Sequence, residues 1–335
     1  MLYVTTREKF DAFTAARAIH SDRGPAGGFY LPYRMPQFSG EELLAMKEKS
    51  FGQNVAERLN QFFSTRFSGW DVEFCIGRYP IRVAPMGQKV LVAECWRNLD
   101  GSYGKMERQI AARICGCGTR EVKLTSWVRI GIRIAVLFGV FSELMRQEIA
   151  DPQQRIDIAV PADDFSMAMA AYYGRQMGLP VANIICGCAD GSAAWNLIHN
   201  GQVRSGDREP VAELERLIFS TLGREEALRF AQAMERGEGY TIAPEKRELL
   251  RQGVFAAVVS GERMESVIPN VFRTSRYIME PDAAVSYAAL MDHRAKTGES
   301  RCALLLADRN PADAAREVAG AMSMTEQQLK DLLGR

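Results

Sequence analysis

The chain has 335 residues, of which 47% are hydrophobic and 25% charged, and its formal net charge is +1. These values are ordinary for a globular protein with a large core and give no argument for binding nucleic acid or an acidic membrane surface. Arg7, Glu8 and Lys9 interrupt the opening residues, so no secretory signal is expected. The most apolar run, 130–141, contains Arg133 and is too short to cross a bilayer. A cytoplasmic protein is therefore expected.

The first part of the chain predicts a mainly helical module. Ser39 followed by Glu42 is a capping-box signature, in which each side chain accepts a hydrogen bond at a helix start. A helix is therefore predicted over 41–49. Further elements expected in this part are a short strand, a turn-rich crossing and an amphipathic helix, at 2–7, 24–32 and 54–63.

Residues 156–181, IDIAVPADDFSMAMAAYYGRQMGLPV, predict a strand, a helix and a second strand. The stretch begins with a nearly continuous apolar run, which suits a strand covered on both faces. The carboxylate of Asp163 or Asp164 would cap the helix, and Gly178 would end it in a left-handed conformation. Such a unit predicts a parallel sheet.

The remaining pattern predicts further strands and amphipathic helices around this unit. Strands are expected at 90–94 and 301–307, and helices at 105–114, 127–149, 190–201, 209–222, 224–236, 310–321 and 325–333. The expected fold class is α/β, with a parallel-sheet core and flanking helices.

Seven cysteines are spread through the chain, an odd number that suggests no disulfide framework. Two Cys-Gly-Cys turns stand out, one with Cys115 and Cys117 and the other with Cys186 and Cys188. Together they would supply thiolates to a zinc ion, although structural zinc sites usually separate such cysteines by roughly two to four residues. The alternative is that they are small, buried side chains beside the ends of the sheet.

Motifs along the whole chain resemble those of threonine synthases. The opening Tyr3-Val4-Thr5-Thr6-Arg7 is similar to the family's Tyr-x-Ser-Thr-Arg, and 27–32, GGFYLP, is similar to its Asp-Gly-Gly-Leu-x-x-Pro. Later positions that match are Trp127, Arg129, Ile130, Pro161, Phe165, Met177-Gly178-Leu179-Pro180, Glu215-Arg216, Pro281, Ala284 and Val285. The resemblance implies the fold-type II architecture of enzymes that depend on pyridoxal phosphate (PLP).

The resemblance also implies a division into two units. Residues 1–85 correspond to the N-terminal module of threonine synthases, and 86–335 to their large α/β domain. Only 17 positions separate Lys105 from Val122 (122 − 105 = 17), where the family has a whole small domain. The small domain is therefore expected to be deleted between about 106 and 121.

In threonine synthases a lysine holds PLP as an imine, and glycine-rich turns bind phosphate. Tyr103-Gly104-Lys105 falls near the family's Phe-Lys-Asp, so Lys105 is the candidate Schiff-base residue, unless it is a solvated lysine of a first helical turn. Candidate contacts to the phosphate lie in two turns and are Gly116, Gly118, Thr119, Asp163 and Asp164. Carboxylates at the second turn would repel a phosphate.

Positions that build the scaffold are kept, whereas positions that contact cofactor or phosphate are mostly changed, as expected when a fold outlives its chemistry. The first hypothesis is a threonine-synthase-like protein without PLP, which no longer converts O-phosphohomoserine to threonine. It would act as a pseudoenzyme that binds a paralogous threonine synthase subunit or a small amino-acid-like ligand. The second is a reduced but active PLP lyase that uses Lys105, and the third is a zinc-stabilised binding module. A homodimer is expected because the missing domain would expose an apolar sheet face.

Overall fold

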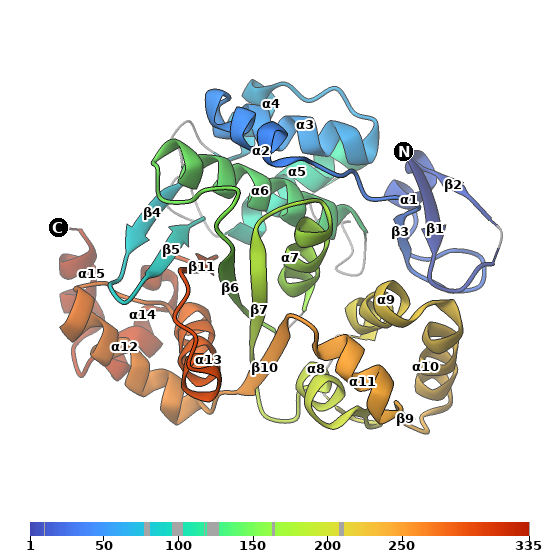
Figure 1. Ribbon diagram of the computed structural model, residues 1–335. Helices are drawn as coiled ribbons and strands as arrows, with labels where there is room; N and C mark the ends of the chain where they lie inside the picture. The colour runs from blue at the N-terminus through green and yellow to red at the C-terminus, as the bar shows by residue number, and fades with distance from the viewer. Residues whose placement is uncertain are drawn as a thin grey trace.

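The computed structural model describes residues 1–9, 11–76, 81–95, 103–116, 118, 127–162, 165–207 and 211–334. At its centre is a six-stranded sheet with the order β10-β7-β6-β11-β5-β4 (Figure 1). The strands are β4 (Arg82–Pro85), β5 (Val90–Glu94), β6 (Ile156–Pro161), β7 (Val181–Cys188), β10 (Val254–Val258) and β11 (Ala303–Ala307). Neighbouring strands are parallel except at the edge, where β4 is antiparallel to β5. The predicted α/β class is confirmed.

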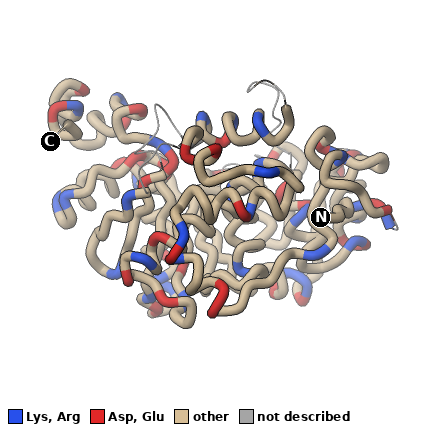
Figure 2. Tube along the Cα trace, turned by 90° about the horizontal axis from the view of Figure 1, so that it is seen from above, with Lys and Arg blue, Asp and Glu red and all other residues tan. Residues whose placement is uncertain are grey.

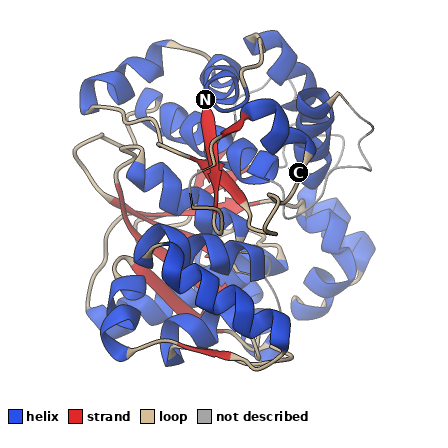
Figure 3. Ribbon diagram, turned by 90° about the vertical axis from the view of Figure 1, so that its right-hand side faces the viewer, coloured by secondary structure: helices blue, strands red, loops and turns tan. Residues whose placement is uncertain are grey.

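Helices cover both faces of the central sheet (Figures 1 and 3). In β11, Leu304 and Leu306 point into one hydrophobic core and Leu305 into the other, as the alternation of a strand requires. The first core includes α6 (Trp127–Arg146) and α7 (Ser166–Gln176), and the second includes α12 (Gly261–Ser275), α13 (Pro281–Thr297), α14 (Ala315–Ala321) and α15 (Glu326–Leu333). Helices of the chain itself thus cover the sheet face that the sequence analysis expected to be exposed.

The predicted strand–helix–strand unit is confirmed, because β6 and β7 are parallel neighbours and α7 connects them. The N-cap residue of α7 is Phe165, which has a left-handed φ of 54° and makes no side-chain cap. The predicted cap residues, Asp163 and Asp164, lie outside the described part of the chain. Gly178 has a φ of +111°, and an added Cβ would lie 2.3 Å from the carbonyl oxygen of Phe38. Glycine is required at this turn.

The N-terminal part combines a small antiparallel sheet, in the order β2-β1-β3, with helices that pack on α6. Its elements are β1 (Leu2–Thr5), β2 (Phe13–Thr14), α1 (Ala15–His20), β3 (Tyr30–Pro32), α2 (Gly40–Ala45), a 3₁₀ turn (Met46–Glu48), α3 (Phe51–Phe63) and α4 (Gly69–Ile76). The capping box of Ser39 and Glu42 is present. Helix α3 lies close to α6, because a Cβ on Gly131 would lie 2.5 Å from the ring of Phe63.

Trp127, at the start of α6, joins the N-terminal part to the core. Its side chain is fully buried. The ring meets those of Tyr3, Phe62 and Tyr173 edge to face, with centroids 6.3, 6.0 and 5.5 Å away. Such pairs stabilise a protein beyond the burial of their area. Segments from β1, α3 and α7 therefore pack around one indole ring.

Two buried side chains fasten α9 (Val211–Leu222) to the first strands. Arg7 donates to both carboxylate oxygens of Glu215, from Nε at 3.0 Å and from Nη2 at 2.8 Å. The hydroxyl of Thr6 donates to the same carboxylate. Arg216 is fully buried, and its Nε donates to the carbonyl of Tyr30 at 3.1 Å. Three of the motifs that resemble threonine synthases thus meet in space, and their role here is structural.

A helical region connects β7 to β10. It contains α8 (Ala193–Trp195), a π-helical turn (Asn196–Asn200), β8 (Gln202–Val203), α9, α10 (Arg224–Arg236), β9 (Tyr240–Thr241) and α11 (Pro244–Arg251). The helix that was expected to begin at residue 190 begins at Ala193. The sequence analysis identified neither β10 nor α11, α12 and α13. Elsewhere, α5 (Tyr103–Cys115) precedes α6, and a 3₁₀ turn (Pro311–Ala314) precedes α14.

Acidic and basic residues are interspersed along the chain (Figure 2), in agreement with the net charge of +1. No face of a single sign stands out in this view, so the structure adds no electrostatic argument for a polyanionic partner. None of the described helices has the length and apolarity needed to cross a membrane.

Candidate functional site

The carboxyl ends of the parallel strands meet at one edge of the sheet. The register places Glu94 beside Ala307, and Cys188 beside Val258. In open sheets of this kind ligands bind outside the carboxyl ends of the strands. We therefore take this edge as the candidate functional site.

A cavity of about 600 Å³ opens at this edge, beside the end of β5. Its polar lining is made by Arg82, Glu94, Arg276, Tyr277, Asn310 and Lys330. The Glu94 side chain is 2% exposed and lies 3.6 Å from Nη1 of Arg82. Burial, and then the Glu94 charge, raise the pKa of Tyr277, whose hydroxyl is hydrogen-bonded to Glu94. Basic groups arranged around one buried carboxylate suit a small molecule that carries both charges.

A second buried acidic group, Glu280, caps α13 at the same edge. Its carboxylate oxygens accept hydrogen bonds from the backbone N–H groups of Asp282 (2.8 Å) and Ala283 (2.7 Å). Arg309, which follows β11, lies 2.9 Å from Asp282 and 3.8 Å from Glu280. Burial, and then the Asp282 charge, raise the pKa of Glu280 to about 8 against these favourable contacts. Glu280 is therefore protonated in most molecules at neutral pH.

Glu280→Gln is expected to flatten the pH dependence of stability. In the unfolded chain the pKa of a glutamate is about 4.3, whereas in the folded protein the pKa of Glu280 is about 8. The free energy of unfolding should therefore fall as the pH rises through this window, by at most about 1.4 kcal/mol per pH unit from this group. Urea unfolding at several pH values between about 5 and 8 measures the slope. Equal slopes of the free energy of unfolding against pH for the parent and the variant would contradict the raised pKa of Glu280.

Lys105 lies in the first turn of α5, and its side chain is exposed. The buried charge on that helix is Glu107, whose carboxylate lies 3.1 Å from Nε of Arg129 and 2.8 Å from Nε of Arg133 on α6. The chain has nine lysines, and all but Lys123 lie in the described part. Of those eight lysines (9 − 1 = 8), none is buried.

The candidate contacts to a phosphate are only partly described. Gly116 follows α5 with a φ of +64°, and a Cβ there would meet nothing within 4 Å. Gly118 is exposed. Thr119, Asp163 and Asp164 lie outside the described residues.

The two Cys-Gly-Cys turns lie in different environments. Cys115 is half-buried, with its Sγ 3.9 Å from the carbonyl of Ile19, whereas Cys186 and Cys188 are buried in β7. Burial raises the pKa of the Cys186 thiol well above its usual range, which disfavours the thiolate that binds zinc. Cys117 is outside the described residues. Among the described residues, no three His, Cys, Asp or Glu side chains are grouped to hold a metal ion.

The glycine of the second turn has a packing explanation. A Cβ on Gly187 would lie 2.6 Å from Cγ1 of Val285 and 2.7 Å from its carbonyl oxygen. Helix α13 therefore approaches β7 too closely for any larger residue at this position. Two buried thiols and the close approach of α13 to the glycine between them therefore explain the Cys-Gly-Cys sequence in β7.

The sequence analysis did not identify the ion pairs of Glu107. Arg133 interrupts the apolar run of α6 four positions after Arg129, so both arginines face the same side of the helix. Because a buried charge needs a partner, the spacing of these two arginines could have indicated a buried carboxylate between them and another element. The partner itself comes from α5 and is not specified by local sequence.

Comparison with known proteins finds similarity to threonine synthases. A sequence model described as "Threonine synthase N terminus" matches residues 2–78. Threonine synthase of Pseudomonas aeruginosa is 24% identical over 214 residues, which cover 58% of this chain and 45% of that protein. Human "Threonine synthase-like 1" is 21% identical over 175 residues, covering 48% of this chain and 24% of that protein. The matched segments thus span less than half the length of these relatives.

The structural likeness extends over the whole chain. The PLP-bound threonine synthase from Brucella melitensis has a TM-score of 0.84 at 17% identity, covering 100% of this chain and 95% of that chain. This chain has the fold of threonine synthases. Threonine synthase from yeast has a TM-score of 0.81 at 14% identity and covers 96% of the threonine-synthase-like chain and 90% of its own. Likeness at this identity concerns the fold, and the chemistry has to be argued from the site.

Proposed function

We propose that this threonine-synthase-like protein has lost the PLP-dependent conversion of O-phosphohomoserine to threonine and acts by binding. The observation that carries the proposal is the exposure of Lys105, together with the absence of a buried lysine among the eight in the described residues. A lysine that forms an imine at neutral pH needs a depressed pKa, which burial provides. An exposed lysine in a first helical turn lacks that environment.

The described residues of the site do not fit PLP. A dianionic phosphate needs converging N–H donors and positive charge. The cavity beside β5 does present three basic side chains, those of Arg82, Arg276 and Lys330. Its buried ionisable group is the Glu94 carboxyl group, and a second buried carboxyl group, that of Glu280, lies at the same edge, so an ionised carboxylate there would repel a phosphate. Two arginines of α6, Arg129 and Arg133, share the carboxylate of Glu107. The site suits a ligand that brings a positive charge of its own.

Addition of PLP followed by borohydride reduction and peptide mapping tests the loss of the reaction. We expect no reduced imine at a single lysine, and only scattered labelling of surface lysines. The Lys105→Ala variant serves as the matched control, since its labelling should differ from the parent by that one residue. Specific reduction onto Lys105 would overturn the proposal and make the protein a reduced PLP lyase. Specific reduction onto Lys123 would overturn it as well.

The proposed ligand is a small amino-acid-like molecule in the cavity beside β5. Its ammonium group would pair with the buried Glu94 carboxylate, and its carboxylate would lie near Arg82 and Arg276. Calorimetric titration with L-threonine and with N-acetyl-L-threonine, which lacks the ammonium, tests this arrangement. We expect the acetylated probe to bind at least about tenfold more weakly, and Glu94→Gln to remove the difference. Equal affinities for the two probes would contradict the role of Glu94.

Self-association, or association with a paralogous subunit, remains part of the proposal. The sheet faces are covered by helices of the same chain, so a dimer would use another surface. On α4, Trp70 and Phe74 are 70% and 79% exposed and lie four positions apart. A strictly monomeric mass at micromolar concentration would count against a homodimer.

A further inference from the structure

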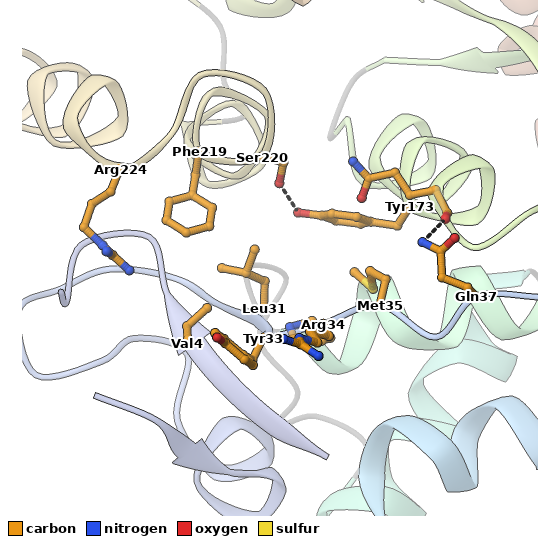
Figure 4. A pocket seen from close by; sticks show the side chains of 12 residues that line it. Val4, Leu31, Tyr33, Arg34, Met35, Gln37, Tyr173, Phe219, Ser220 and Arg224 are labelled. Atoms are coloured by element: carbon orange, nitrogen blue, oxygen red, sulfur yellow. Dashed lines mark hydrogen bonds between the residues drawn. The ribbon is translucent and has the colours of Figure 1, made fainter. Parts of the chain in front are cut away.

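A second cavity, of about 610 Å³, lies between the N-terminal sheet, the end of α7 and the junction of α9 with α10 (Figure 4). It shares no lining residue with the cavity beside β5. Val4, Leu31 and Tyr33 line it from the N-terminal side, and Phe219 faces them from the end of α9. The volume is in the range of pockets that hold small molecules, and the walls are mostly apolar.

Three of the five uncharged polar side chains in the wall, those of Gln37, Tyr173 and Ser220, already form hydrogen bonds within the protein. The hydroxyls of Tyr173 and Ser220 are 3.0 Å apart, and Nε2 of Gln37 donates to the carbonyl of Gln176 at 2.9 Å (Figure 4). These bonds hold α7 against α9 and against the segment after β3. They leave few uncharged polar groups in the wall to receive a ligand.

The charged residues among the described lining are two arginines, and this lining includes no Asp or Glu. Arg224 is the first residue of α10, and its guanidinium carbon lies 5.6 Å from the centroid of Phe219. Its Nε is buried and has no hydrogen-bond partner. A buried N–H of a guanidinium without an acceptor costs free energy, which an anionic oxygen in the cavity would offset. Arg34 lines the opposite side, next to the ring of Tyr33.

We propose that this cavity binds a small molecule with a flat apolar body and one carboxylate. The carboxylate would accept hydrogen bonds from Arg224, and the body would lie between Leu31, Tyr33 and Phe219. A guanidinium binds a carboxylate through two parallel N–H groups, so Nε and one Nη of Arg224 would both be used. This inference is independent of the function proposed for the carboxyl edge of the sheet.

Isothermal titration calorimetry with 3-phenylpropionate and with 3-phenylpropionamide tests the proposal, because the two probes share their apolar body and differ in charge. We expect the acid to bind at least about tenfold more tightly than the amide. Arg224→Met, which keeps an unbranched apolar side chain, should reduce the affinity for the acid to that for the amide. Arg236→Met, in the last turn of the same helix and outside the cavity lining, should leave both affinities unchanged.

A second pair of variants locates the binding. Val4→Trp should fill the cavity and abolish binding of both probes, whereas Leu2→Trp, on the same strand but outside the lining, should have no effect. Should Val4→Trp fail to fold, the comparison of Arg224→Met with Arg236→Met decides alone. Equal binding of acid and amide, unchanged binding in Arg224→Met, or no binding of either probe at millimolar concentration would each overturn the proposal.

Discussion

Replacing Glu215 with alanine is expected to lower the free energy of unfolding by about 3–5 kcal/mol. The Glu215 side chain is fully buried and accepts a bidentate pair from Arg7 as well as a hydrogen bond from Thr6. Alanine would leave the guanidinium, whose side chain is only 8% exposed, without this carboxylate. A guanidinium keeps its charge even without an acidic partner, so Arg7 cannot reduce this cost by losing its proton. Urea unfolding followed by circular dichroism measures the loss.

Glu235→Ala is the matched control, because Glu235 pairs with the same arginine. Its side chain is 59% exposed, and exposed ion pairs contribute little. We expect a loss below about 1 kcal/mol. Similar small effects for the two variants would show that the buried pair adds no more to stability than the exposed one, and would contradict the prediction.

Trp127→Ala is expected to destabilise the protein by about 3–5 kcal/mol, as large-to-small substitutions of buried aromatic residues do. The ring is fully buried, and its removal would leave a cavity between Tyr3, Phe62 and Tyr173. Because these side chains come from separate segments, the cavity cannot close without moving one of them. The same unfolding measurement gives the effect.

Trp70→Ala provides the comparison for Trp127→Ala. Trp70 is 70% exposed on α4, and a substitution at such a surface position usually changes stability by no more than about 0.5 kcal/mol. A difference of several kcal/mol between the two tryptophan variants is therefore expected. Equal midpoints of unfolding would indicate that Trp127 does not join the N-terminal part to the core.

Features with a local cause were predicted from the sequence. The strand Val90–Glu94 and the helix Arg224–Arg236 have the bounds that their apolar patterns indicate, and the capping box at Ser39 forms as expected. The parallel pairing of β6 with β7 follows from the helix between them. In each case the residues that determine the structure lie within a few positions of one another.

Features that depend on distant residues were not predicted. The strand β10 has only five residues, two of them alanine, which gives little signal outside its sheet, and α12 contains Pro269 in its interior. The exposure of Lys105 depends on how α5 packs, and its own sequence is compatible with either environment. The cavity lined by Arg224 brings together strands, helices and a turn that are far apart in the chain.

The pairing of Arg7 with Glu215 can form only late in the synthesis of the segment that joins them. The two residues are 208 positions apart, so the ribosome must make all of the chain between them before Glu215 can reach Arg7. Closing a loop of this length costs conformational entropy before any contact repays it. Until α9 is made, Thr6 and Arg7 lack the buried carboxylate that they bind in the folded protein.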